Sequence, residues 1–120
     1  MRVLLVDDEM EYVSTLAERL SFRGIEVRWA SSAKEALAYI NKEPFDIAVL
    51  DVKMPKMGGI ELKQKIEEIV PGMRFIYLTG HGSEDDYKRG VTDGISYLIK
   101  PVDIDQLVKA MNQAAADRID

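Results

Sequence analysis

The chain has 120 residues, of which 47% are hydrophobic and 31% are charged, a balance typical of one soluble globular domain. It contains no cysteine, which excludes disulfides and thiolate metal sites. The net charge of -5, with no run of Lys or Arg, argues against direct nucleic-acid binding, and no apolar stretch approaches the roughly 20 residues of a membrane span.

The first half of the chain alternates between strand-like and helix-like segments. Val3–Val6 is a continuous apolar run, typical of a strand buried on both faces. Apolar residues at helical spacing follow, and Gly24 ends that helix. Residues 25–29 alternate between apolar and charged side chains, which predicts a half-exposed strand at the edge of a sheet. Ser32 and Glu35 form a capping box that opens a second helix.

The second half continues the alternation. Three further strands are expected at Ile47–Leu50, Phe75–Leu78 and Ile95–Ile99. A helix marked by Leu62, Ile66, Ile69 and Val70 is expected between the first two of these strands, and a short polar helix from Ser83 to about Val91. The last helix opens at Asp103 with Gln106, and its expected inner face is Ile104, Leu107, Val108, Met111 and Ala115.

Five strands alternating with five helices predict one α/β domain over residues 1–120. Because crossovers between parallel strands are right-handed, and because the second strand has the pattern of an edge, we expect a doubly wound parallel sheet of order 2-1-3-4-5, which is a flavodoxin-like fold. In this order the ligand crevice lies at the carboxyl ends of the strands, beside the switch between strands 1 and 3.

Reactive side chains follow four of the expected strands: Asp7 and Asp8, Asp51, Thr79, and Lys100. Two carboxylates ~4 Å apart repel by about 4 kcal/mol at an effective dielectric constant near 20, so such a cluster needs a proton or a cation. Acids without nearby His or Cys favour a hard cation such as Mg²⁺. A carboxylate can also attack phosphorus, with a lysine and a hydroxyl holding the phosphoryl oxygens. The simpler alternatives are a helix cap for Asp7 or Asp8, a surface lysine, and a turn threonine.

In order and at this spacing, four segments resemble a response-regulator receiver domain over essentially the whole chain. They are Val6–Glu9, Asp51–Gly59, Leu78–Gly82 and Tyr97–Pro101. The resemblance implies that Asp51 accepts a phosphoryl group from the phosphohistidine of a histidine kinase. It implies that Asp8 and Asp51, with the main-chain carbonyl of Lys53, bind Mg²⁺ (or Mn²⁺), and that Asp7 assists through water.

The resemblance also assigns roles to residues around the acids. Lys100 would contact the phosphoryl group, and Thr79 and Tyr97 would be a switch pair that shifts the surface of the fourth helix, fifth strand and fifth helix. Lys53 and His81 flank the expected phosphate entrance and would tune the phosphoryl lifetime. The Lys100–Pro101 bond is a candidate for the cis form, as in relatives. Thr92–Gly94 departs from the Ala-Gly-Ala that many relatives have before the fifth strand.

The resemblance implies a regulatory phosphoacceptor, not an enzyme that turns over a substrate. Its expected partners are a sensor histidine kinase or phosphotransfer protein and a downstream effector, with a homodimer possible and no organic cofactor. Met1-Arg2 is followed at once by an apolar run and two acids, which is no signal peptide, so a cytoplasmic location is expected. No output domain follows in this chain; a stand-alone regulator and a fragment of a longer one both remain open.

Three other functions compete. A haloacid-dehalogenase-like phosphatase also places Asp, Thr and Lys along such a sheet, but it needs an acid two residues after its nucleophile, where Asp51 is followed by Lys53. Asp7 does have Glu9 at that distance, although the chain is short for a phosphatase with a cap. A flavodoxin-like mononucleotide binder needs Ser, Thr and Gly amides in the loop after its first strand. This chain has Asp7-Asp8-Glu9 there, and these acids would repel the phosphate of a nucleotide. A pseudo-receiver that only binds proteins would not need the intact acids, Thr79 and Lys100.

Overall fold

The computed structural model describes residues 1–80 and 95–116. The strands are β1 (Arg2–Val6), β2 (Glu26–Ala30), β3 (Ile47–Asp51), β4 (Arg74–Thr79) and β5 (Ser96–Ile99). The helices are α1 (Met10–Ser21), α2 (Ala33–Lys42), α3 (Gly59–Ile69) and α5 (Ile104–Ala116). The strands form one parallel sheet in the order β2-β1-β3-β4-β5, which confirms the predicted topology. The helix expected from Ser83 to about Val91 lies outside the described residues, so four of the five expected helices are seen.

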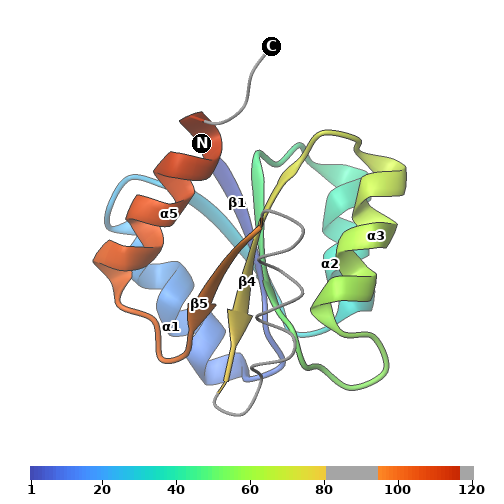
Figure 1. Cartoon of the computed structure of the whole chain (residues 1–120), viewed down its shortest axis with the longest axis horizontal. Coiled ribbons are helices and arrows are strands. Elements are labelled where there is room, and N and C mark those ends of the chain that lie inside the picture. Colours follow the sequence, from blue (N-terminus) through green and yellow to red (C-terminus); the bar gives the residue numbers. More distant parts are fainter. Residues whose placement is uncertain (81–94, 117–120) are drawn as a thin grey trace.

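Two layers of helices cover the sheet (Figure 1). Helices α1 and α5 lie on one face and α2 and α3 on the other. The side chains of β1 alternate between the two cores, since Val3 and Leu5 pack toward α1 and α5 while Leu4 and Val6 pack toward α2 and α3. All four are at most 1% exposed, which is why the sequence of this strand is apolar throughout. Among the described helices, none is long and apolar enough to cross a membrane.

Side-chain caps fix where two helices begin. The hydroxyl of Ser32 accepts a hydrogen bond from the main-chain N–H of Glu35 at 3.2 Å, as the capping box predicts. The carboxylate of Glu35 reaches one residue further back than expected and accepts from the N–H and hydroxyl of Ser31. The carboxylate of Asp103 accepts from the N–H of Asp105 at 2.8 Å, which confirms the predicted start of α5.

The apolar stripes of two helices end differently from the prediction. Ile69 and Val70 both belong to the apolar spacing that predicts this helix, but Ile69 is 44% exposed and only the half-buried Val70 of the two packs against the core. Ala115 is also exposed, and the stripe of Met111 continues through Ala114. In both cases the sequence leaves a choice between i+3 and i+4 at the end of a helix, and the position of the sheet decides which of them is buried.

A cluster of ion pairs lies at the amino ends of the strands, which we call the Arg2 cluster. Arg2 contacts the carboxylate of Glu26 at 3.1 Å and that of Glu43, which also accepts from Arg28 at 3.4 Å. The carboxylate of Asp46 accepts a hydrogen bond from the main-chain N–H of Arg2 at 2.8 Å. The cluster therefore joins β1, β2, the end of α2 and the start of β3 at one end of the sheet.

Candidate functional site

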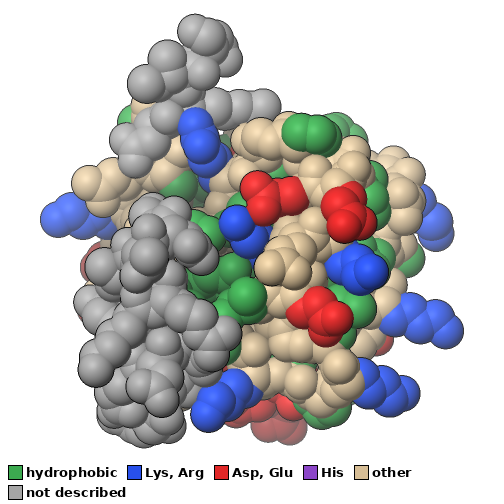
Figure 2. Space-filling view, turned by 45° about the vertical axis from the view of Figure 1, so that its right-hand side comes forward, with side chains coloured by type: hydrophobic (Ala, Val, Ile, Leu, Met, Phe, Trp, Pro, Cys, Tyr) green, Lys and Arg blue, Asp and Glu red, His purple; other side chains and the backbone are tan. Residues whose placement is uncertain are grey.

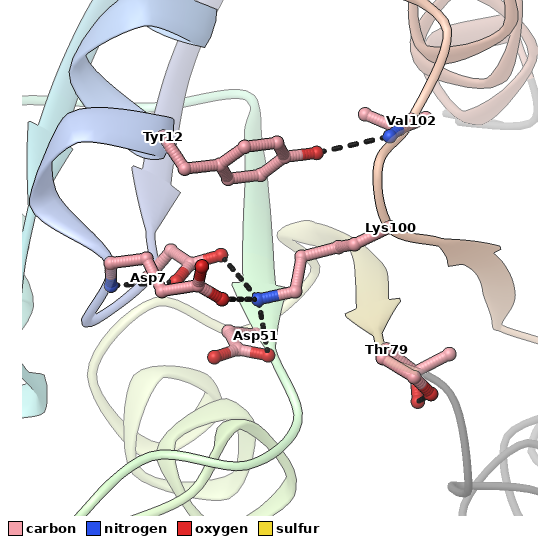
Figure 3. Close-up of polar contacts among 8 residues, drawn as sticks. Asp7, Tyr12, Asp51, Thr79, Lys100 and Val102 are labelled. Carbon is pink, nitrogen blue, oxygen red and sulfur yellow. Dashed lines mark hydrogen bonds and ion pairs between the residues drawn. The ribbon is translucent and has the colours of Figure 1, made fainter.

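The predicted reactive residues meet at the carboxyl edge of the sheet, at the opposite end of β1 from the Arg2 cluster. Asp7 follows β1 and Asp51 ends β3, and these two strands are hydrogen-bonded neighbours. One oxygen from each of Asp7, Asp8 and Asp51 lies within 4.8 Å of the other two. The structure thus confirms that the three acids form one cluster, and Figure 3 shows Lys100 reaching into it from the end of β5.

The ammonium of Lys100 lies among three carboxylates. Its Nζ atom is 2.7 Å from Glu9 Oε1, 3.0 Å from Asp7 Oδ2 and 3.6 Å from Asp51 Oδ1. Burial lowers the pKa of Lys100, but the hydrogen bonds to Glu9 and Asp7 and the charge of Asp51 outweigh burial and leave the pKa above its ordinary value. The lysine is therefore charged at neutral pH and partly neutralises the acids. Glu9 was not among the predicted site residues.

The acids differ in their exposure and in their affinity for protons. Asp7 is fully buried and Asp51 is 3% exposed, whereas Asp8 faces solvent. Burial raises the pKa of Asp51 to about 7, the charge of Asp7 adds to this effect, and Lys100 opposes it. Burial also raises the pKa of Asp7, although the N–H of Glu9, 2.9 Å from Asp7 Oδ1, and Lys100 work against it. One ammonium does not balance this much buried negative charge.

The donor set fits a hard divalent cation. The cluster offers carboxylate oxygens only, and one of its acids is open to solvent, so that a cation could keep part of its water shell. Lys53, whose main-chain carbonyl is an expected ligand, is exposed in the loop directly after β3. These features suit Mg²⁺ better than Zn²⁺, for which His and Cys ligands are usual.

The loop that follows Asp51 packs tightly against the strand end. A Cβ atom on Gly59 would lie 2.4 Å from the carbonyl oxygen of Asp51, and one on Gly58 would lie 2.5 Å from that of Val52. The N–H of Gly59 donates to this Val52 oxygen at 3.0 Å. Between them, Lys56 has a φ of 69°, a left-handed conformation that side chains other than glycine seldom adopt. The start of α3 is thereby held directly against the candidate phosphoacceptor.

The two predicted switch residues lie on neighbouring strands. Thr79 is 3% exposed, and its hydroxyl donates to the carbonyl of Gly80 at 3.2 Å, pointing away from the ammonium of Lys100 (Figure 3). Tyr97 is half-buried and pairs in register with Tyr77, and the centroids of the two rings are 5.0 Å apart. Thr79 is therefore at the site, while Tyr97 lies on the sheet face beside it. His81 and Thr92–Gly94 lie outside the described residues.

Tyr12 is a second residue that the sequence did not reveal. Its hydroxyl accepts a hydrogen bond from the N–H of Val102 at 3.0 Å, and its ring centroid lies 5.5 Å from Nζ of Lys100. The Lys100–Pro101 peptide bond between these contacts is cis, as considered from the sequence. Helix α1 begins just after the acid pair, so residues at its start face the segment that follows β5. This closeness in the chain to Asp7 and Asp8 was the sequence signal that could have pointed to Glu9 and Tyr12 as site residues.

Both signs of charge are present on the face of the molecule that Figure 2 shows. Figure 2 shows acidic and basic side chains interspersed over this face of the described residues. The acidic charge that distinguishes the site lies in the cluster of Asp7, Asp8 and Asp51, of which Asp7 and Asp51 are buried and Asp8 is exposed.

Comparisons with known proteins agree with this geometry. A family model described as the response regulator receiver domain matches residues 3–112. The transcriptional regulatory protein GlrR of Escherichia coli (strain K12) is 39% identical over 113 residues, which are 93% of this chain and 26% of that protein. A receiver domain protein (CheY-like) from Methanospirillum hungatei JF-1 has 34% identity and a TM-score of 0.87, over 98% of this chain and 94% of that one. NtrX from Brucella abortus has 28% identity and a TM-score of 0.88, over 96% of this chain and 27% of that one. The chain thus spans about a quarter of GlrR.

Proposed function

Because the chain belongs to the response regulator receiver domain family, we propose that it is a phosphorylation-dependent signalling switch whose phosphoacceptor is Asp51. The observation that carries the proposal is the placement of Asp51 beside two further acids and within 3.6 Å of the Lys100 ammonium. A buried nucleophile, a cation-binding acid cluster and a fixed positive charge are the parts that phosphoryl transfer to a carboxylate requires.

In the proposed reaction, an oxygen of Asp51 attacks the phosphorus of a phosphohistidine. A P–O bond forms, the P–N bond breaks, and its electron pair leaves with the imidazole nitrogen of the donor. Lys100 is already charged and lies near the acceptor, so it can balance charge on the phosphoryl oxygens without rearranging far. A Mg²⁺ or Mn²⁺ ion held by Asp8, Asp51 and the main-chain carbonyl of Lys53, with Asp7 assisting through water, would neutralise the remaining charge.

The readout of the switch would pass through Thr79 and Tyr97. Among the described residues, the Thr79 hydroxyl donates to the carbonyl of Gly80, and a phosphoryl oxygen on Asp51 would be a stronger, charged acceptor. Thr79 would turn toward it, Tyr97 would turn inward, and the surface formed by β5, α5 and the expected helix between β4 and β5 would change its population of states. Lys53 and His81 would tune how long the phosphoryl group survives.

The proposed role is regulatory, not that of an enzyme with turnover. A sensor histidine kinase or phosphotransfer protein would supply the phosphoryl group, and an effector domain or protein would read the altered surface, in a cytoplasmic setting. A homodimer is also part of this proposal. The chain spans only part of relatives such as GlrR, so an effector on the same polypeptide is compatible with it.

The test is phosphorylation by a small phosphodonor such as acetyl phosphate in the presence of Mg²⁺, followed by intact mass measurement. The wild type is expected to gain the mass of one phosphoryl group, and Asp51→Asn is expected to gain none. Asp46→Asn, which changes an acid of the Arg2 cluster at the other end of β3, is the matched control and should react like the wild type. A wild type that never reacts would exclude the function, and an Asp51→Asn variant that still reacts would exclude only the site.

A further inference from the structure

Glu9 differs from the other partners of Lys100 because it stands outside the acid cluster. Its carboxylate makes the shortest of the three contacts to Nζ, at 2.7 Å, yet the oxygens that converge for a cation belong to Asp7, Asp8 and Asp51. A cation in the cluster would compete with Lys100 for Asp7 and Asp51, but not for Glu9. The ion pair between Glu9 and Lys100 therefore persists when a cation occupies the acid cluster.

The main chain of Glu9 is fixed while its side chain is free to leave. The N–H of Glu9 donates to Asp7 Oδ1 at 2.9 Å, and its carbonyl accepts from the N–H of Val13 at 3.0 Å in the first turn of α1. The Glu9 side chain, however, is 64% exposed, against 1% for Asp7. A carboxylate in this position can hold an ammonium and can also exchange it for water at little cost.

The geometry of Lys100 shows which contacts compete. Its Nζ lies closest to Glu9 and farthest from Asp51, at 2.7 Å and 3.6 Å. The proposed function requires this ammonium to bind phosphoryl oxygens attached to Asp51, which would draw it away from Glu9. The contact with Glu9 in the resting state and the contact with the phosphoryl oxygens therefore compete for the same ammonium of Lys100.

We propose that Glu9 is a positioning residue that holds Lys100 in the resting state and competes with the phosphoryl group for its ammonium. This inference rests on the proposed function of Asp51. It assigns Glu9 the role of setting how readily the site accepts a phosphoryl group, without touching phosphorus or the cation. Removing the contact is expected to strengthen binding of a phosphoryl mimic.

Three substitutions separate the contact from the charge. Glu9→Gln removes the charge at nearly constant size, and Glu9→Asp keeps the charge but shortens the side chain by one methylene, so that it no longer reaches Lys100. Glu11→Gln removes a charge from the same turn of α1, and the Glu11 carboxylate is not a partner of Lys100. Each variant is titrated with beryllofluoride at saturating Mg²⁺ by isothermal titration calorimetry, after circular dichroism has shown that it is folded.

Glu9→Gln and Glu9→Asp are both expected to bind beryllofluoride about two- to fivefold more tightly than the wild type, the range for losing one partly exposed ion pair. Glu11→Gln should bind like the wild type. Weaker binding by Glu9→Gln, or a Glu9→Asp variant indistinguishable from the wild type, would overturn the role of Glu9 while the proposed function stands. A wild type that binds no beryllofluoride and takes up no phosphoryl group would exclude both the role of Glu9 and the proposed function.

Discussion

Replacing Asp51 by asparagine is expected to stabilise the fold, and to do so more at pH 8 than at pH 5. Burial is the main cause that raises the pKa of Asp51 from 3.8 to about 7. The unfolded chain therefore releases this proton at lower pH than the folded chain does, so the stability of the wild type falls as pH rises from about 4 to about 7 and then levels off. At about 1.4 kcal/mol per pKa unit, the ionised group costs at most about 4 kcal/mol above pH 7.

Asparagine keeps the shape of the side chain and cannot ionise. Allowing for relaxation around the charge in the wild type, we expect Asp51→Asn to raise the free energy of unfolding by about 2–4 kcal/mol at pH 8, and by about 2 kcal/mol less at pH 5. Urea denaturation followed by circular dichroism, without divalent ions, measures both values. The Glu11→Gln variant, which loses a solvent-exposed charge, should change by no more than about 0.5 kcal/mol at either pH. Equal stabilisation at the two pH values, or a less stable variant at pH 8, would refute the assignment of the cost to the ionised Asp51.

Three further outcomes follow from the site and its loop. Mg²⁺ at a hundred times its dissociation constant should stabilise the wild type by about 2.7 kcal/mol in thermal melts, and Asp8→Asn should lose most of this gain at the same concentration. Lys56→Gly should raise the free energy of unfolding by about 0.5–1 kcal/mol, because glycine adopts a φ of 69° without strain. The urea midpoint should rise accordingly, and a lower midpoint would contradict this. Gly59→Ala should lower stability by more than about 2 kcal/mol, since its Cβ would meet the Asp51 carbonyl at 2.4 Å, and near-wild-type urea unfolding would argue against that clash.

The topology was accessible from the sequence because the sheet determines the pattern of each strand. Val3–Val6 and Ile47–Leu50 are apolar at every position since helices cover both faces of β1 and β3. Residues 25–29 alternate because, in this edge strand, Val27 and Trp29 pack against the core on one face of the sheet while Glu26 and Arg28 point to the other face and are exposed. Once the strand order is known, the acids and the lysine that follow the strands must meet at one edge, as Asp7, Asp51 and Lys100 do.

The contacts that complete the site were not accessible in the same way. Glu9 meets Lys100, and Tyr12 meets Val102, across 91 and 90 positions of the chain. Residue patterns indicate which elements are neighbours, but a contact between two long side chains depends on rotamers that no periodicity encodes. Ala115 has a different reason: the apolar spacing of the last helix allows either Ala114 or Ala115 to face inward, and in the structure Ala114 packs against the core.

The two polar clusters on β1 have a thermodynamic consequence for each other. The Arg2 cluster and the acid cluster are separated by the four buried residues of Val3–Val6, and Arg2 and Asp7 are about 16 Å apart at the rise of a parallel strand. Effects of substitutions at sites this far apart, with no shared partner, usually add. Substitutions that strengthen the Arg2 cluster can therefore offset the stability lost to the ionised acids without altering the chemistry of the acid cluster. Substitutions at the two ends of the sheet should affect stability independently.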